Sequence, residues 1–250
     1  MLRSIAPPTG ALGCSGVRAV ILCGGRGTRA WPATAEVPKP MLEIGGRPVL
    51  HHVMEIYARQ GFTDFLLATG YKGDVIADWA GTLTDGWTVD CLDTGNDAGT
   101  GDRVRACAER LDGTFLATYG DGLGNIDVGA SIEAHRSHRH QATVTVVPLP
   151  SQYGTIDTDA AGCVTAFKEK PTLRDHWINA GFFVLEAATI TATPGTSLEQ
   201  DVLPALAANG ELYVYRHEGF WRSMDTHKEV VELNALAEKE GHPWLQVPTH

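Results

Sequence analysis

The sequence predicts an α/β fold in which helices flank a mostly parallel sheet. Up to about residue 150, short apolar segments rich in β-branched residues alternate with segments of helical periodicity. This alternation is typical of parallel sheets. Loops rich in glycine and charge follow the first and a central predicted strand, and ligands bind such sheets beyond the carboxyl ends of their strands. We therefore expect a ligand site at that edge.

The first half of the chain supplies most of the predicted sheet. Its strands are short and apolar, and they cover residues 17–23, 62–70, 87–95, 114–122 and 142–149. The helices between them cover residues 48–60, 72–81, 103–111 and 127–140. The first of these helices has apolar residues at helical spacing and stops at Gly61.

The second half departs from this alternation. It predicts a hairpin, a strand, a helix, one or two strands and a terminal helix, at residues 153–171, 178–186, 197–210, 211–226 and 227–241. The hairpin turn is expected near residues 159–162, and Ser197 is a suitable N-cap for the helix that follows it. The start of the chain, residues 1–16, is rich in Pro, Gly and Ser and predicts a flexible tail.

Composition excludes several classes of protein. The chain has 250 residues and a formal net charge of -10, which argues against a nucleic-acid binder because such proteins need a basic face. No apolar run approaches the roughly 20 residues of a membrane helix, and the N-terminal stretch is a poor signal peptide. The five cysteines include no C-x-x-C pair and indicate a reduced, cytoplasmic protein: Cys14, Cys23, Cys91, Cys107 and Cys163.

The loop after the first strand, "CGGRGTRAWP", allows two interpretations. Gly25, Gly27 and Ala30 fit the dinucleotide-binding pattern, but that pattern needs a helix to start at once so that its N-terminus meets the pyrophosphate. Three prolines follow instead, and proline prevents an uninterrupted helix. A Walker A loop is excluded because no G-K-[ST] is present. The dehydrogenase interpretation therefore fails on its context.

The second interpretation is an extended loop that wraps a nucleoside triphosphate. Gly24, Gly25 and Gly27 would let backbone N–H groups approach phosphates closely. Arg29 offers a planar fork to phosphate oxygens, and Lys39 offers a point charge in a loop stiffened by prolines. A plain glycine-rich turn with two solvated cations is the alternative.

Further charged residues occur in short motifs downstream. Asp121 lies in "YGDG" after an apolar strand, Lys170 in "FKEKP" and Asp225 in "MDT". Each alone is more often a turn or surface residue. The run "HRSHRH" at 135–140 suggests a metal site, but its place at a helix C-terminus favours a solvated basic face.

Together, these motifs resemble the sugar-1-phosphate nucleotidyltransferase family. The resemblance rests on "AVILCGGRGTR…PKPM", "YGDG", "EKP", "INAGFFV" and "FWRSMDT" in that order, from about residue 17 to 245. "LDTGNDAGTGDRV" and "MDT…EGHPW" are most similar to the glucose-1-phosphate cytidylyltransferase branch. The resemblance implies a Rossmann-like, mostly parallel mixed sheet flanked by helices, a nucleotidyltransferase (GT-A-like) fold with a small sugar-binding β subregion.

The resemblance also implies that residues 17–250 form a single domain with three parts. It implies a nucleotide-binding part at 17–150, a sugar-phosphate-binding part at 151–230, and a C-terminal helix and tail at 226–250. The implied nucleotide-binding residues are Gly24, Gly25, Gly27, Thr28, Arg29, Arg103 and Gly120. The implied sugar-phosphate-binding residues are Gly154, Glu169, Lys170 and Asn179.

The implied chemistry is in-line attack of a sugar phosphate oxygen on the α-phosphorus of a nucleoside triphosphate, with release of pyrophosphate. Arg29, Lys39 and Lys170 are the implied catalytic residues, and Asp121 and Asp225 the implied ligands of Mg²⁺. The reaction brings two polyanions together, so positioning and charge neutralisation would supply the catalysis.

The resemblance favours CTP and α-D-glucose 1-phosphate as substrates and a homo-oligomer as the assembly. The chain departs from the branch in three places: the segment between Asp78 and Val89 is short, Ala180 stands where glycine is usual, and "FWRSMDT" is altered just before Asp225. Other bases (dTTP, UTP, GTP) and other acceptors (a heptose or cyclitol phosphate) therefore stay open. A non-catalytic sugar-nucleotide-binding protein is the alternative from another class.

Overall fold

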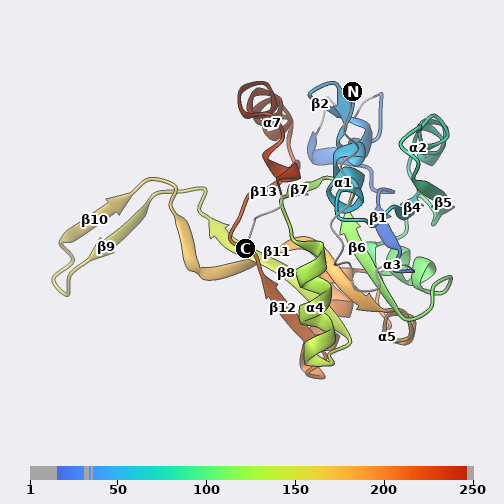
Figure 1. The fold of residues 1–250 in the computed structure, drawn as a ribbon. Coiled ribbons are helices and arrows are strands. Elements are labelled where there is room, and N and C mark those ends of the chain that lie inside the picture. The colour runs from blue at the N-terminus through green and yellow to red at the C-terminus, as the bar shows by residue number, and fades with distance from the viewer. Residues whose placement is uncertain (1–15, 31–33, 35, 247–250) are drawn as a thin grey trace, which may run out of the picture.

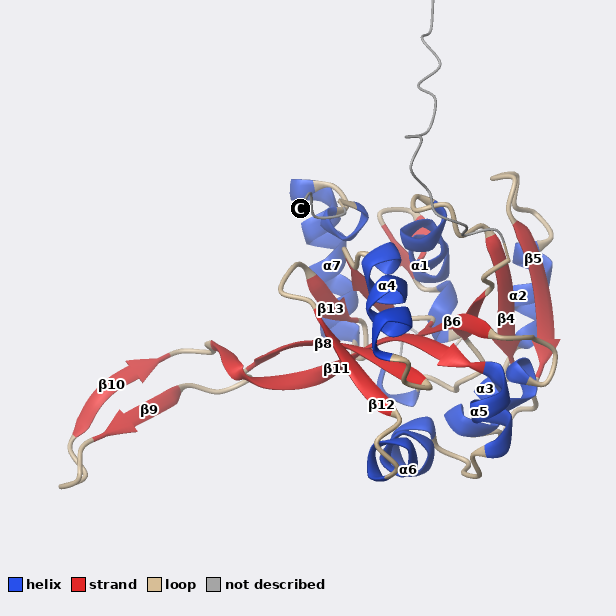
Figure 2. Cartoon of the chain, turned by 60° about the horizontal axis from the view of Figure 1, so that its bottom comes forward, coloured by secondary structure: helices blue, strands red, loops and turns tan. Residues whose placement is uncertain are grey.

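A seven-stranded sheet forms the centre of the computed structural model, which describes residues 16–30, 34 and 36–246 (Figures 1 and 2). The strand order is β12-β8-β11-β6-β1-β4-β5. The strands are β1 (Ala19–Leu22), β4 (Asp64–Thr69), β5 (Thr88–Asp93), β6 (Thr114–Tyr119), β8 (Ala142–Pro150), β11 (Thr172–Glu186) and β12 (Leu212–Arg216).

The sheet is mixed but mostly parallel, as the sequence predicts. Strand β1 pairs in parallel with β4 and β6, β4 with β5, and β12 with β8. Strand β11 runs antiparallel to both of its neighbours, β6 and β8. The sheet contains strands from both predicted parts of the domain, since β8 ends at Pro150 and β11 and β12 follow it.

Helices cover both faces of the central strands of the sheet because these strands are apolar on both sides. In β1, Ile21 faces one buried cluster and Val20 the other, which is the alternation of a strand. Residues of α1, α2, α4 and α7 belong to the first cluster and those of α3, α5 and α6 to the second. The helices are α1 (Val49–Ala58), α2 (Gly73–Ala80), α3 (Thr100–Ala108), α4 (Val128–His138), α5 (Ala187–Ala192), α6 (Leu203–Ala208) and α7 (His227–Glu240).

Short elements complete the edge of the sheet where its parallel strands end. Strand β7 (Gly122–Gly124) pairs with β13 (Trp221–Ser223), and β2 (Glu43–Ile44) with β3 (Arg47–Pro48). The remaining turns of helix are η1 (Thr28–Ala30), η2 (Lys39–Met41), η3 (Leu198–Val202) and η4 (Pro243–Leu245).

A two-stranded arm extends away from the body of the molecule (Figure 2). We define the arm as residues 151–171, which include the paired strands β9 (Thr155–Thr158) and β10 (Val164–Lys168). It carries four strongly exposed large hydrophobic side chains: Tyr153, Ile156, Val164 and Phe167. Exposed apolar residues in this number on one slender element indicate a surface that another molecule covers.

Most predicted elements are present, with differences at short segments. Ser197 caps a helix as predicted, since its side chain accepts a hydrogen bond from Gln200 N. That helix begins as a π turn and continues as α6. The segments β2, β3, β7 and α5 were not predicted because they are too short to show a period. Apart from Gly16, the predicted tail lies outside the described residues.

Candidate active site

The glycine loop begins where β1 ends, beside the end of β6. Leu22 pairs with Tyr119, and Gly120 N donates to Leu22 O at 3.0 Å. The loops after these two strands are therefore neighbours, as expected for parallel strands. In the described residues, the first α-helix after the loop starts only at Val49, which agrees with the proline argument.

Two glycines of this loop have no room for a side chain. A Cβ on Gly24 would overlap the guanidinium of Arg103, and a Cβ on Gly27 would lie 2.7 Å from Lys39 Cβ. Gly27 also has a φ of +60°, a conformation that favours glycine. The loop therefore needs glycine to pack against Arg103 on one side and Lys39 on the other.

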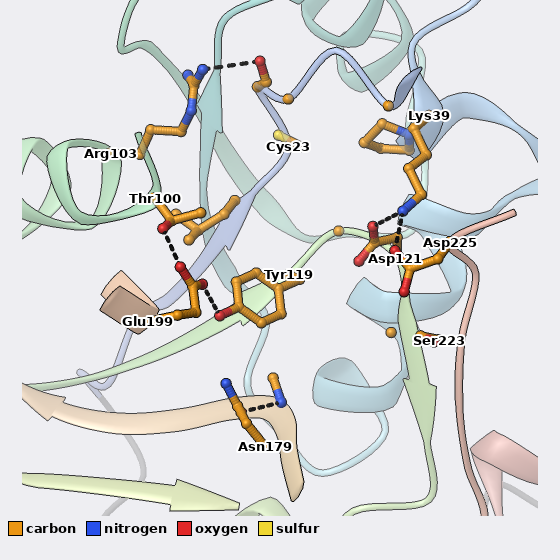
Figure 3. A pocket seen from close by; sticks show the side chains of 18 of the residues that line it. Cys23, Lys39, Thr100, Arg103, Tyr119, Asp121, Asn179, Glu199, Ser223 and Asp225 are labelled. Carbon is orange, nitrogen blue, oxygen red and sulfur yellow. Dashed lines mark hydrogen bonds and ion pairs between the residues drawn. The ribbon is translucent and has the colours of Figure 1, made fainter. Parts of the chain in front are cut away.

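Arg103 holds the loop from behind. Its guanidinium is buried and donates to Gly24 O at 3.0 Å (Figure 3). It also donates to Thr69 O at 2.9 Å and to Thr94 Oγ1. Burial lowers the pKa of Arg103 from its ordinary value. The sequence placed Arg103 near the nucleotide phosphates. It does line the pocket, but its donors bind two backbone carbonyls and the hydroxyl of Thr94, and so join the glycine loop to the end of β4 and the turn after β5.

Lys39 bridges the two predicted metal ligands. Its Nζ lies 2.5 Å from Asp121 Oδ2 and 2.9 Å from Asp225 Oδ1 (Figure 3). Burial would lower the pKa of Lys39, but the two carboxylates outweigh it and the pKa lies above its ordinary value. Lys39 and Asp225 lie 186 positions apart in the chain, so the fold alone brings these charges together.

The pairing of β7 with β13 explains how the two aspartates meet. Gly122 pairs with Ser223, and Met224 N donates to Asp121 O at 3.0 Å. This short ladder places Asp225 beside the loop that follows β6. The side chain of Glu229 in α7 accepts from Asp225 N at 2.6 Å and so fixes the backbone of the second aspartate.

A second polar group lies on the opposite side of the pocket (Figure 3). Glu199 accepts hydrogen bonds from Tyr119 Oη, from Thr100 Oγ1 at 2.7 Å and from Ser197 Oγ at 3.0 Å. Burial raises the pKa of Glu199, but these hydrogen bonds outweigh it and the pKa lies below its ordinary value. We call these four residues the Glu199 cluster.

Asn179 approaches the same side from β11. Its Oδ1 accepts from Gly181 N at 2.7 Å, and it lines the cavity together with Tyr119. Gly181 has a φ of +80°, and a Cβ there would overlap the ring of Tyr119. The backbone turn at Gly181 thus places Asn179 and Tyr119 together.

These groups line one cavity of about 660 Å³ at the carboxyl edge of the sheet. Most of the predicted site residues line it: Gly24, Gly25, Gly27, Thr28, Lys39, Arg103, Gly120, Asp121, Asn179 and Asp225. The side chain of Arg29 lies outside what the structure describes, although its backbone belongs to η1. The predicted role of Arg29 therefore stays a prediction.

Three predicted sugar-side residues lie elsewhere. Gly154, Glu169 and Lys170 belong to the arm and do not line the cavity. Glu169 and Lys170 are exposed and lie 4.0 Å apart in an ion pair. The arm that carries them extends from the end of the ribbon that β8 and β11 form (Figure 2), whereas Asn179 lines the cavity. Their predicted binding role stays a prediction.

The sequence reasoning missed the Glu199 cluster. Glu199 lies in the first turn after an N-cap serine, where an acidic residue normally complements the helix dipole. Tyr119 ends an apolar strand, where it resembles a core residue. The one sequence feature that pointed to this cluster was the position of Tyr119, two residues before Asp121 in the "YGDG" motif.

The histidine run at 135–140 is not wholly solvated. His135 is buried and contacts Thr143 Oγ1 at 2.9 Å and Glu186 Oε1 at 3.1 Å, while His138 stacks on Tyr213. Within the described ranges, no three His, Cys, Asp or Glu side chains gather closely enough to hold a metal. His135 is therefore a paired residue of the core.

The fold and this site define a class of protein. The model of the nucleotidyl transferase family matches residues 18–240, so the chain belongs to that family. It is 39% identical to the glucose-1-phosphate cytidylyltransferase of Salmonella typhi, over 91% of this chain and 98% of that protein. It is 34% identical to the mannose-1-phosphate guanylyltransferase of Mycobacterium tuberculosis, over 88% of this chain and 64% of that protein.

Solved structures show the same fold. HddC from Yersinia pseudotuberculosis matches with a TM-score of 0.70 and 25% identity, over 88% of this chain and 98% of that chain. A putative glucose-1-phosphate thymidylyltransferase from Bacillus anthracis matches with a TM-score of 0.68 at 21% identity, over 90% of this chain and 96% of that chain. The predicted fold class and the resemblance drawn from the motifs are both confirmed. Across the described ranges, each helix is too short or too polar to span a bilayer.

Proposed function

We propose that the protein transfers a nucleotidyl group from a nucleoside triphosphate, with CTP favoured, to a sugar 1-phosphate, with α-D-glucose 1-phosphate favoured. One observation carries this proposal. Lys39, Asp121 and Asp225 converge at one point of a cavity that the glycine loop also lines. Two carboxylates and an ammonium beside a loop of accessible backbone N–H groups suit phosphate chemistry.

The reaction needs no covalent intermediate. An oxygen of the sugar phosphate forms a bond to the α-phosphorus, the bond from that phosphorus to the bridging oxygen breaks, and pyrophosphate leaves with the electron pair. Lys39 would neutralise the charge on the phosphates, and the glycine loop would hold the triphosphate in line. Arg103 fixes this loop from behind through Gly24 O.

The acidic pair fits a divalent cation such as Mg²⁺. Both carboxylates already contact a single positive atom, the Nζ of Lys39, so they are close enough to share a cation. Carboxylate oxygens are the ligands that hard cations prefer. Asp121 and Asp225 would hold the ion, and when bound it would supply charge neutralisation to the phosphate oxygens.

The choice of base and sugar rests on the relatives. The Salmonella typhi protein is named for glucose 1-phosphate and cytidylyl transfer, and it aligns with this chain over nearly its whole length. The guanylyltransferase from Mycobacterium tuberculosis is less similar, but it shows that the same framework serves another base and another sugar. Thymidylyl, uridylyl or guanylyl transfer and a heptose or cyclitol phosphate acceptor are therefore alternatives within the proposal.

A homo-oligomer is part of the proposal. A two-stranded ribbon is marginally stable alone in water, and the arm exposes Tyr153 (78%), Phe167 (63%), Ile156 (57%) and Val164 (57%). A second copy of the chain that covers these side chains would stabilise the arm. This assembly and the cytoplasmic location stay proposals.

The test is pyrophosphate release with Mg²⁺, measured for CTP, dTTP, UTP, GTP and ATP against a panel of sugar 1-phosphates. We expect release with CTP and glucose 1-phosphate, and its loss when EDTA is added. Release with another pair would keep the reaction and change the substrates. Nucleotide binding without release for any pair would favour the alternative, a non-catalytic sugar-nucleotide-binding protein.

A further inference from the structure

The cavity has two ends of different chemistry. At one end lie the ammonium of Lys39 and the pair of aspartates that it bridges. At the other lies the Glu199 cluster, whose charge is a single carboxylate surrounded by hydroxyls (Figure 3). The two ends face each other across the same cavity. A ligand that carries both phosphate and hydroxyl groups therefore has a preferred orientation in it.

The carboxylate of Glu199 is fixed but not saturated. Its Oε2 accepts from Thr100 and Ser197, while its Oε1 accepts from Tyr119. A carboxylate can accept about four hydrogen bonds, so Oε1 retains capacity. Glu199 also lines the cavity and is exposed to it. The free capacity therefore faces the space that a ligand would enter.

A carboxylate selects its ligands by charge. It repels phosphate and accepts hydrogen bonds from hydroxyl and amino groups. Tyr119, which donates to this carboxylate, lines the cavity together with Asn179. Hydroxyl groups of a pyranose ring, or of a ribose, are the substrate groups that suit this chemistry.

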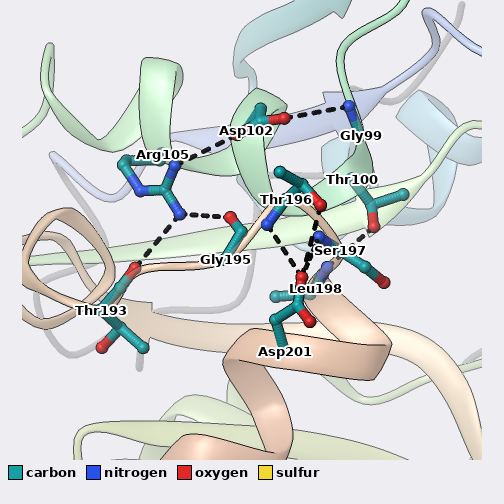
Figure 4. A network of polar contacts seen from close by, with 10 residues as sticks. All are labelled: Gly99, Thr100, Asp102, Arg105, Thr193, Gly195, Thr196, Ser197, Leu198 and Asp201. Carbon is teal, nitrogen blue, oxygen red and sulfur yellow. Dashed lines mark hydrogen bonds and ion pairs between the residues drawn. The ribbon is translucent and has the colours of Figure 1, made fainter.

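The carboxylate of Glu199 is not needed to hold its own loop in place. Gly101 N already donates to Thr196 O at 2.8 Å, and Leu198 N donates to Thr100 Oγ1 at 2.9 Å. On the side shown in Figure 4, Asp201 accepts from the backbone N–H groups of Thr196 and Ser197, each at 2.9 Å. The loop is thus anchored without Glu199, whose carboxylate contacts Tyr119 and the cavity instead.

We propose that Glu199, positioned by Tyr119 and Thr100, accepts hydrogen bonds from ring hydroxyls of the sugar 1-phosphate and so determines acceptor specificity. The inference rests on the proposed function. The carboxylate also keeps the phosphate of the acceptor away from this end and turns it toward Lys39. The sugar is favoured over the ribose because Asn179, the predicted sugar-side residue of β11, lines the same cavity as Tyr119 and Glu199.

The experiment removes the carboxylate of Glu199 and the ring hydroxyls of the sugar, separately and together. The kcat/KM of wild type and Glu199→Gln is measured with glucose 1-phosphate and with its 3-, 4- and 6-deoxy analogues. A parallel series compares CTP with 2′-deoxy-CTP and 3′-deoxy-CTP. Glutamine has the same shape and removes the charge. It keeps one acceptor oxygen, and the hydroxyl beside its amide nitrogen can accept a hydrogen bond instead of donating one.

We expect Glu199→Gln to lower kcat/KM about 10- to 100-fold with glucose 1-phosphate, because a hydrogen bond to a charged group is lost. For one deoxy analogue, the loss in kcat/KM caused by the variant and the loss caused by the missing hydroxyl should be less than additive, because both changes remove the same contact. Equal losses with every sugar analogue would overturn the proposal. Non-additivity confined to the deoxynucleotides would also overturn it and assign the carboxylate to the ribose.

Asp201→Asn is the matched control, because Asp201 caps the same loop but does not line the cavity. It should lower the unfolding temperature and leave the ratios between analogues unchanged. If wild type shows no turnover, the proposed function fails, and calorimetric binding of glucose 1-phosphate decides the inference separately. Weaker binding by Glu199→Gln would support it, whereas equal binding, or none by wild type, would overturn it.

Discussion

The two halves of strand β11 both pair with β8 but lie in different surroundings. From Ala180 to Leu185 the strand lies between β6 and β8, and almost every side chain is buried. From Thr172 to Asn179 it pairs with β8 alone, toward the arm, and no side chain is fully buried. Backbone pairing thus continues where the core has ended, so strand formation and burial are separate properties.

This difference separates the roles of the body and the arm. The body buries both faces of its sheet and holds the cavity residues on fixed elements, as a site with defined geometry requires. The arm has no second layer and exposes Tyr153 and Phe167. Changes in the body should therefore affect chemistry and folding, whereas changes in the arm should affect association.

The largest effect should come from the acidic pair in the body. Asp121→Asn removes a carboxylate that contacts Lys39 at 2.5 Å. We expect kcat to fall about 1000-fold, because a charge that positions the phosphates is lost. Pyrophosphate release measures the change, and nucleotide binding by calorimetry is the control. Normal turnover by Asp121→Asn would contradict the assignment of this residue.

The next effect concerns the stability of the body. Arg103→Met removes three hydrogen bonds of a buried guanidinium, to Gly24 O, Thr69 O and Thr94 Oγ1, although Tyr71 N and Thr94 still donate to the two carbonyls. We expect the free energy of unfolding to fall by about 3 kcal/mol. Urea denaturation measures it. Arg105→Met is the comparison, because Arg105 is partly exposed and contacts Asp102 and the loop at Gly195 (Figure 4). Arg105→Met should therefore lower the free energy of unfolding by less than Arg103→Met.

A pH effect should also be confined to the body. His52 is buried against Ile44 O, near His51, His242 and Glu55, and burial lowers its pKa to about 4. Between pH 4 and 6.5 the unfolded chain therefore binds more protons than the folded one, so stability falls as the pH falls. From pH 7 to 5 we expect a loss of about 2 kcal/mol.

His52→Gln should flatten this dependence, as measured by urea denaturation at each pH. Glutamine can still donate to Ile44 O but does not titrate. An equally steep profile in the variant would assign the acid sensitivity to other groups, such as His217, whose pKa burial also lowers.

The smallest effect on stability should come from the arm. Phe167→Ser replaces an exposed ring, so the unfolding free energy of the isolated subunit should change by less than about 0.5 kcal/mol. The mass measured by light scattering should nevertheless fall if the ring contacts a second copy. Val231→Ser, an exposed site on α7, is the control. An unchanged mass would show that the arm does not carry the assembly.

Much of the site could be predicted because its residues lie in short motifs. Gly27, Lys39 and Asp121 each occur beside turn or proline signals that a sequence displays directly. Glu199 could not be found in this way, since its neighbours Tyr119 and Thr100 come from other elements. The resemblance named Arg103, which lines the cavity. Its hydrogen-bond partners could not be predicted, because no sequence motif indicates which backbone carbonyls a side chain will meet.

The sequence by itself determined the alternation of strands and helices, the hairpin at 153–171, the glycine loop and the motifs that indicate phosphate chemistry. These features depend on neighbours a few positions apart, where period, glycine and proline act directly. Only the tertiary structure decided that Asp225 meets Asp121, that Glu199 enters the cavity and that Lys170 lies outside it. Such outcomes depend on which strands pair and where a ribbon leaves the core, and these are settled by packing over the whole chain.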